Sequence, residues 1–224
     1  MIPKKIHYCW FGRKEIPERE RNFIEGWRRL LPDYEIIEWN ESNYDVNRLL
    51  YVREAYRMGL YAFVSDVCRL EALYNDGGIY LDTDIELLKS FDPFLGLQSF
   101  TGTEYDGHIA TGVIGSQPGE PWIREALDYY SGRHFLNHLG HPKKKPNPRI
   151  FTEDVLPKVP RGNLPKSFAP EFFTAKDYRS GEILATANTV AVHHFVASWR
   201  RRKTLAERIA TLKKGLRVRY FTKN

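Results

Sequence analysis

Short β-prone stretches alternate with amphipathic ones along most of this chain. We expect strands at 5–11, 34–39 and 79–81, and further strand-like segments near 98–104 and 109–115. Helices are expected at 18–31, 45–58, 60–75 and 121–130. The clearest helix is 60–75, in which Phe63, Val67, Leu70 and Tyr74 recur at helical spacing. Strands that alternate with helices predict an α/β fold with a mostly parallel central sheet flanked by helices.

Charge is unevenly distributed along the 224 residues. Residues 200–224 hold ten Lys or Arg and one Glu, a net charge of +9, whereas residues 1–199 hold 24 basic and 27 acidic side chains, a net charge of −3. An acidic body argues against a nucleic-acid-binding domain, because such a domain would carry a basic face on the fold itself. We therefore expect two parts, a folded domain over 1–199 and a basic segment over 200–224.

The first residues and the two cysteines bear on the cellular compartment. The chain opens Met-Ile-Pro-Lys-Lys, without the apolar segment of a secretory signal. Cys9 and Cys68 lie far apart and match no metal-binding spacing. We expect free thiols and a cytoplasmic protein.

Two carboxylates follow the predicted strand at 79–81. Asp82 and Asp84 are two residues apart, so their side chains leave the same face of an extended chain. Carboxylates that close repel one another unless a cation lies beside them, and Mg²⁺ or Mn²⁺ suits such a pair. Asp66 and Arg69 share a face of the preceding helix, and Gly77-Gly78 would fold that helix back beside the strand. The alternatives are an ordinary polar turn and a surface ion pair.

Two further motifs frame this region. The run SDVCRLEALYNDGGIYLDTD at 65–84 is preceded by IPKKIHYCWFG at 2–12 and followed by HHFVASW at 193–199. In this order the three segments resemble the sugar-binding region of family 32 glycosyltransferases, which includes fungal outer-chain mannosyltransferases and bacterial capsule and lipopolysaccharide enzymes. The resemblance implies a GT-A-like nucleotide-sugar-binding fold over 1–199 and a hexosyltransferase activity.

The resemblance also implies roles for the residues that match. Asp82 and Asp84 would be the catalytic pair and would hold Mn²⁺ or Mg²⁺ together with His193, although His194 stays open as the ligand instead. Trp10 would stack on the nucleobase, unless it is a core residue. The donor-binding residues implied by the family are Trp10, Asp66, Arg69, Gly78, Tyr80, Ser198 and Trp199.

The expected reaction is transfer of a sugar, with retention, from a UDP-linked donor to a hydroxyl group of a glycan or lipid-linked acceptor. The resemblance places this reaction in the synthesis of surface polysaccharide, either capsule or lipopolysaccharide. Two alternatives remain, a metal-dependent nucleotide-sugar hydrolase and a non-catalytic adaptor at the membrane surface.

The basic segment contains a predicted amphipathic helix. Thr204 and Glu207 form a capping box, and an apolar stripe follows at Leu205, Ile209, Leu212 and Leu216. The stripe either packs on the body or, together with the basic residues, attaches the protein to the anionic inner face of the cell membrane. Nucleic-acid binding is the third and weakest interpretation.

Overall fold

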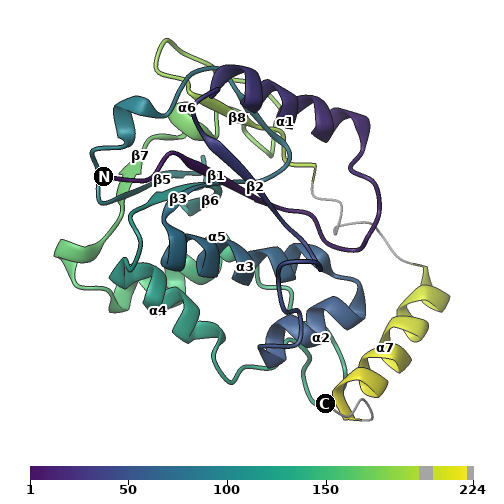
Figure 1. The fold of residues 1–224 in the computed structure, drawn as a ribbon. Coiled ribbons are helices and arrows are strands. Elements are labelled where there is room, and N and C mark those ends of the chain that lie inside the picture. Colours follow the sequence, from purple (N-terminus) through teal and green to yellow (C-terminus); the bar gives the residue numbers. More distant parts are fainter. Residues whose placement is uncertain (197–203, 221–224) are drawn as a thin grey trace.

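The computed structural model describes residues 1–196 and 204–220 and has an α/β architecture (Figure 1). Among these residues, the central sheet has six strands, in the spatial order β2 (Glu35–Trp39), β1 (Lys5–Cys9), β3 (Gly78–Leu81), β6 (Ile109–Ser116), β5 (Ser99–Thr103) and β7 (Lys166–Phe168). Strand β6 pairs antiparallel with both β3 and β5, whereas the remaining pairs are parallel. The expected mostly parallel sheet is confirmed, with one reversed strand inside it.

Helices cover both faces of the sheet (Figure 1). One face carries α1 (Glu18–Leu30), the short α6 (Pro170–Phe173) and a two-stranded sheet made of β4 (Ile85–Leu87) and β8 (Ala191–His193). The other face carries α2 (Leu50–Met58), α3 (Tyr61–Asp76), α4 (Pro121–Tyr130) and the short α5 (Asn147–Ile150). Single turns of 3₁₀ or π type occur at Asp92–Phe94, Phe151–Val155, Leu156–Lys158 and Arg161–Asn163.

Because side chains alternate along β3, this strand contributes to the hydrophobic core on each face of the sheet. Ile79 and Leu81 pack with Trp27 of α1 on one face, and Tyr80 packs with α2 and α3 on the other. The Asp82 N–H still donates to the Gly112 carbonyl of β6 (2.9 Å), so the pairing continues one residue beyond the strand. Asp82 therefore lies on the same side as Tyr80, toward α3.

Helix α2, which follows β2 in the chain, begins later than the sequence suggests. The Asp45 carboxylate accepts the Asn47 N–H (2.9 Å) in a local turn, and α2 begins only at Leu50. Gly59 ends α2 in the left-handed conformation (φ 72°), as predicted. Cys9 and Cys68 are buried free thiols.

The last helix, α7 (Leu205–Tyr220), lies beside α2 (Figure 1). Its capping box is confirmed, because the Glu207 N–H donates to Thr204 Oγ1 (3.2 Å) and the Thr204 N–H donates to Glu207 Oε2 (2.7 Å). Among the described residues, no helix combines the length and apolarity needed to cross a membrane.

Candidate functional site

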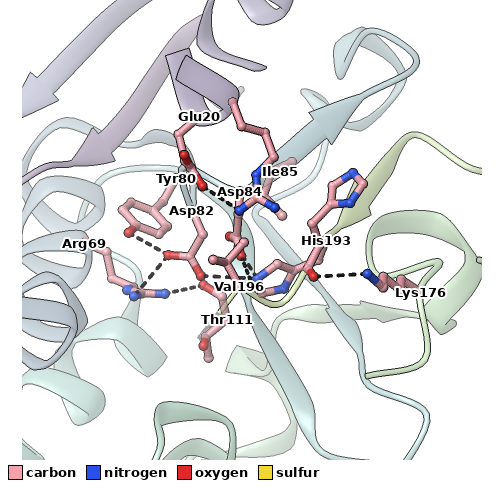
Figure 2. Close-up of polar contacts among 12 residues, drawn as sticks. Glu20, Arg69, Tyr80, Asp82, Asp84, Ile85, Thr111, Lys176, His193 and Val196 are labelled. Carbon is pink, nitrogen blue, oxygen red and sulfur yellow. Dashed lines mark hydrogen bonds and ion pairs between the residues drawn. The ribbon is translucent and has the colours of Figure 1, made fainter. Parts of the chain in front are cut away.

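Asp82, Asp84 and His193 come together at the carboxyl end of β3 (Figure 2). His193 Nε2 lies 3.1 Å from Asp84 Oδ1 and 4.0 Å from Asp82 Oδ2. The antiparallel pairing of β4 with β8 sets Ile85 opposite His193, which brings His193 beside the two aspartates although 109 positions separate it from Asp84 in the sequence. One candidate ligand atom from each of the three residues lies within 4.8 Å of the others.

Each carboxylate has one oxygen held by the protein. Asp82 Oδ1 accepts the Tyr80 hydroxyl (2.9 Å) and lies 3.3 Å from Arg69, whereas Asp82 Oδ2 faces His193. Asp84 Oδ2 accepts the Val196 N–H (2.8 Å), whereas Asp84 Oδ1 faces His193. The two oxygens that face the histidine are thereby oriented toward a common point.

Without a cation the cluster contains an ion pair. Burial by itself would raise the pKa of Asp84, but the charge of His193 and the Val196 N–H outweigh burial and lower this pKa to about 2. Burial opposes protonation of His193, yet the neighbouring Asp84 raises the pKa of the imidazole above its ordinary value. The site therefore already stabilises positive charge between its carboxylates.

The donor set fits a divalent cation. Two carboxylate oxygens and an imidazole nitrogen suit Mn²⁺ or Mg²⁺, with the imidazole favouring Mn²⁺. Within the described residues, the buried His193 Nδ1 atom has no hydrogen-bond partner. Gly112 leaves the space that the cluster occupies, because a Cβ there would lie 2.9 Å from the imidazole and 3.2 Å from Asp82 Oδ2.

Arg69 of α3 contacts this cluster through Asp82. Its buried guanidinium group lies 3.0 Å from Asp66 Oδ1, donates to the Thr111 carbonyl (2.6 Å), and stacks over the Tyr80 ring with its carbon 4.4 Å from the ring centroid. Figure 2 shows it pointing toward Asp82. In this structure Arg69 orients Asp82 rather than projecting into solvent.

The two histidines of the closing motif point to different partners. His194 Nε2 lies 2.8 Å from Glu86 Oε2, and its ring stacks on Phe23 of α1 with the centroids 5.0 Å apart. His193 is thus the histidine that faces Asp82 and Asp84. The sequence leaves this choice open, because neighbours in a strand face opposite sides.

Phe195 and Gly112 also contact His193, although no sequence pattern marks either of them. Phe195 has a φ of 53°, a conformation that a phenylalanine keeps only where its surroundings hold it, and its ring stacks on His193 with the centroids 4.0 Å apart. A left-handed phenylalanine has no sequence signature. Gly112 stood in the sequence without a role, since only the β3–β6 pairing brings it to the cluster.

Trp10 lies just beyond the carboxyl end of β1, and its described contacts do not include the residues of the cluster. Its indole is half-buried, and Nε1 donates to the Lys14 carbonyl (2.6 Å). It lines a cavity of about 310 Å³ at the ends of β1 and β2, together with Arg13, Lys14, Glu38, Asn40, Glu41 and Ser42. Ligands of open α/β sheets bind at this edge, beyond the carboxyl ends of the strands.

The remaining expected site residues are Gly78, Tyr80, Ser198 and Trp199. Gly78 lies at the amino end of β3, whereas Asp82 follows its carboxyl end. A Cβ on Gly78 would lie 2.8 Å from the Lys5 carbonyl oxygen. Tyr80 is buried under Arg69 and reaches the cluster only through its hydroxyl group. Ser198 and Trp199 lie outside the described residues.

Comparison with known proteins connects this geometry to a family. Residues 17–101, which contain Asp66, Arg69, Asp82 and Asp84, match the family model described as the glycosyltransferase sugar-binding region containing the DXD motif. Inositol phosphoceramide mannosyltransferase 1 of Schizosaccharomyces pombe is 29% identical over 199 residues, which cover 75% of this chain and 59% of that protein. Inositol phosphoceramide mannosyltransferase 3 of the same organism is 30% identical over 132 residues, which cover 56% of this chain and 36% of that protein.

The chain thus spans between about a third and three-fifths of these relatives' length. Among solved structures, a glycosyltransferase involved in the glycosylation of the major capsid of PBCV-1 aligns with a TM-score of 0.51 at 13% identity, covering 93% of this chain and 98% of that one. This likeness confirms the GT-A-like glycosyltransferase fold. Residues 17–101 therefore match the family of glycosyltransferase sugar-binding regions that contain the DXD motif.

Proposed function

We propose that this protein is a metal-dependent glycosyltransferase that moves a sugar from a nucleotide-sugar donor to a hydroxyl group of a glycan or lipid-linked acceptor. The observation that carries the proposal is the cluster of Asp82, Asp84 and His193, which lies at the carboxyl end of β3 where a GT-A-like sheet binds its ligand. The intact cluster argues against a non-catalytic adaptor on the same fold, because such an adaptor has no need of three converging ligands.

In this proposal Asp82, Asp84 and His193 hold Mn²⁺ or Mg²⁺. When bound, the cation neutralises the nucleoside diphosphate as its bond to the sugar breaks, which stabilises charge that develops in the transition state. Arg69 and Tyr80 fix the orientation of Asp82, and the Val196 N–H fixes that of Asp84. These groups are set before the donor arrives, so no reorganisation is needed during the reaction.

The donor would extend from this cluster toward Trp10. The cavity beside Trp10 leaves part of the indole accessible, which supports a stacking role on a nucleobase rather than a place in the core. The resemblance implies that Asp66 contacts the donor sugar, and its carboxylate is buried against Arg69 behind the cluster. The resemblance favours a UDP-linked donor and retention, with attack from the same face assisted by the leaving phosphate.

The names of the relatives bear on the acceptor. The named relatives are inositol phosphoceramide mannosyltransferases, which supports a lipid-borne acceptor and adds mannose to the donor sugars to be tested. We place the reaction in surface polysaccharide synthesis on the strength of the family resemblance.

The test is diphosphate release from a panel of UDP- and GDP-linked hexoses. Release should require Mn²⁺ or Mg²⁺, stop in EDTA, and fall about 100-fold or more in Asp84→Asn. Glu86→Gln is the matched control, because Glu86 lies on the adjacent strand and contacts His194 instead of the cluster. Full activity in EDTA or in folded Asp84→Asn would overturn the proposal, and release that stays hydrolytic with glycan and lipid-linked acceptors present would favour a hydrolase.

A further inference from the structure

The final helix is fixed to the body by its carboxyl-terminal half. Gly215 crosses the loop at Gly140 so closely that a Cβ on Gly215 would overlap the Gly140 carbonyl oxygen. The Tyr220 hydroxyl donates to the His138 carbonyl (2.8 Å), and Arg219 lies 3.7 Å from the buried Glu54 of α2. Val218 packs against the core on this side. The orientation of α7 on the body is therefore defined.

Most of the apolar stripe of α7 is exposed. Leu205 is 74% exposed, Ile209 is 48% exposed and Leu216 is 36% exposed, whereas Leu212 is half-buried. Of the two readings that the sequence left open, packing of the stripe on the body is not what the structure has. The helix docks mainly through other residues, and the described part of the chain leaves Leu205, Ile209 and Leu216 exposed.

The helix that carries the exposed stripe also carries exposed basic side chains. Arg208, Lys213 and Lys214 are exposed on α7, as is Arg217. They belong to the segment 200–224 with its net charge of +9, next to a body of −3. An occupant of this face must therefore accept apolar side chains and carry negative charge.

These two requirements select one kind of partner. A nucleic acid would satisfy the charge but leave the leucines in water. A second copy of this chain would cover the leucines but oppose two segments of +9, which repel. The surface of an anionic bilayer satisfies both, because its acyl boundary takes apolar side chains and its headgroups attract Lys and Arg.

We propose that α7 binds the surface of an anionic membrane, with Leu205, Ile209 and Leu216 immersed and the basic residues at the headgroups. Val196, which contacts Asp84, and Thr204, which caps α7, are eight residues apart, so the chain limits their separation to roughly 29 Å. The helix thereby holds the cluster of Asp82, Asp84 and His193 near the bilayer. This inference goes beyond the proposed function and does not depend on it.

The first test is co-sedimentation of the full chain, without donor or metal, with vesicles of phosphatidylcholine alone and of phosphatidylcholine mixed with phosphatidylglycerol. The full chain should bind the mixed vesicles, and high salt should weaken binding because exposed charges are screened over about 8 Å at physiological ionic strength. Leu205→Ser with Ile209→Ser should weaken binding at least tenfold, since each loses an immersed side chain. Leu88→Ser with Leu164→Ser, two exposed leucines on the body, is the matched control and should bind like the wild type.

The second test separates charge from apolar contact. Lys213→Gln with Lys214→Gln should weaken binding to the mixed vesicles by roughly fivefold per residue. Arg21→Gln with Arg29→Gln, two exposed arginines on α1, should leave binding unchanged. The proposal is overturned if the full chain ignores the mixed vesicles, if it binds neutral vesicles equally well, or if the α7 variants bind like the wild type. It is also overturned if light scattering without vesicles shows a dimer that Leu205→Ser with Ile209→Ser dissociates.

Discussion

Gly112 matters to the proposed metal site because it has no side chain. It lies on β6 with the imidazole of His193 and the carboxylate of Asp82 directly over its Cα. Any larger residue would push the histidine away from the aspartates. The packing around the cluster thus requires a glycine at a position that supplies no ligand.

We predict that Gly112→Ala weakens Mn²⁺ binding by about 10- to 100-fold, the usual effect of disturbing a residue that positions metal ligands. The reason is the 2.9 Å approach of the new Cβ to the imidazole. Titration calorimetry measures the effect. Gly102→Ala on β5 is the control, because its Cβ would meet only ordinary contacts at 3.4 Å or more; equal Mn²⁺ affinity in all three proteins would show that Gly112 is an ordinary strand residue.

The contribution of Asp66 to the stability of the fold depends on pH. Burial raises its pKa to about 7, although Arg69 acts in the opposite direction. The folded chain therefore binds this proton more tightly than the unfolded chain, whose aspartate titrates near pH 4. It follows that the stability contributed by protonated Asp66 is fully present below about pH 4 and is lost as the pH rises through 7.

In EDTA, the free energy of unfolding should fall between about pH 4 and pH 7 by at most about 1.4 kcal/mol per pH unit on account of Asp66. Asp66→Asn should flatten this slope, whereas Glu15→Gln, a change at an exposed carboxylate, should keep it. Urea unfolding across the pH range measures both. Parallel slopes in wild type and Asp66→Asn would mean that Asp66 is not held protonated by burial.

At the scale of elements, the turn from α3 into β3 sets where the aspartates emerge. Gly77 and Gly78 have φ values of 64° and 102°, which reverse the chain within two residues. A Cβ at Gly78 would lie 2.8 Å from the Lys5 carbonyl oxygen of β1. The turn thereby allows β3 to lie against β1, with Asp82 at the far end.

Gly78→Ala should lower the free energy of unfolding by about 1–3 kcal/mol more than Gly59→Ala does, since only Gly78 adds a steric overlap. Gly59 is a suitable reference because it also has a positive φ, while a Cβ there would have no neighbour within 4 Å. Denaturant unfolding of the two variants gives the comparison. Equal losses would indicate that the backbone conformation alone, and not the approach to β1, requires glycine at 78.

The elements that could be predicted from the sequence are those that local pattern defines. Helix α3, the Gly-Gly turn and the capping box of α7 follow from periodicity and from residue types a few positions apart. The late start of α2 could not be predicted, because Asp45 satisfies a turn as readily as a helix end. The reversed direction of β6 depends on pairing between distant strands, which no local pattern reveals.

The same distinction holds for the site. Asp82 and Asp84 are visible in the sequence because they end an apolar strand. Which histidine joins them depends on the β4–β8 register, and the buried position of Arg69 depends on how α3 packs on the sheet. Long-range contacts determine these features, so the sequence could name the residues but not their orientation.

At the scale of the whole molecule, two candidate binding sites lie along one edge of the central sheet. The cluster of Asp82, Asp84 and His193 lies at the carboxyl end of β3, and the cavity beside Trp10 lies at the ends of β1 and β2. Both belong to the edge at which GT-A-like sheets bind ligands. A donor that spans the two would bind through its base at one end and through its diphosphate at the other.

Trp10→Ala should therefore weaken nucleoside diphosphate binding by about 1–3 kcal/mol, the usual contribution of stacking on a base. Metal binding in the absence of nucleotide should not change, because Trp10 has no contact with the cluster. Calorimetric titration of UDP and GDP with Mn²⁺ present measures the loss. Wild-type nucleotide affinity in a folded Trp10→Ala protein would place the base elsewhere.

The central claim is that Asp82, Asp84 and His193 form a divalent metal site. Its most direct test is titration of the metal-free protein with Mn²⁺, followed by electron paramagnetic resonance, in the wild type, Asp84→Asn and Glu86→Gln. The account predicts that the wild type and Glu86→Gln bind Mn²⁺ alike and that Asp84→Asn, with its fold intact, loses the site. Unchanged Mn²⁺ binding by folded Asp84→Asn, or no binding by the wild type even with a nucleoside diphosphate present, would contradict it.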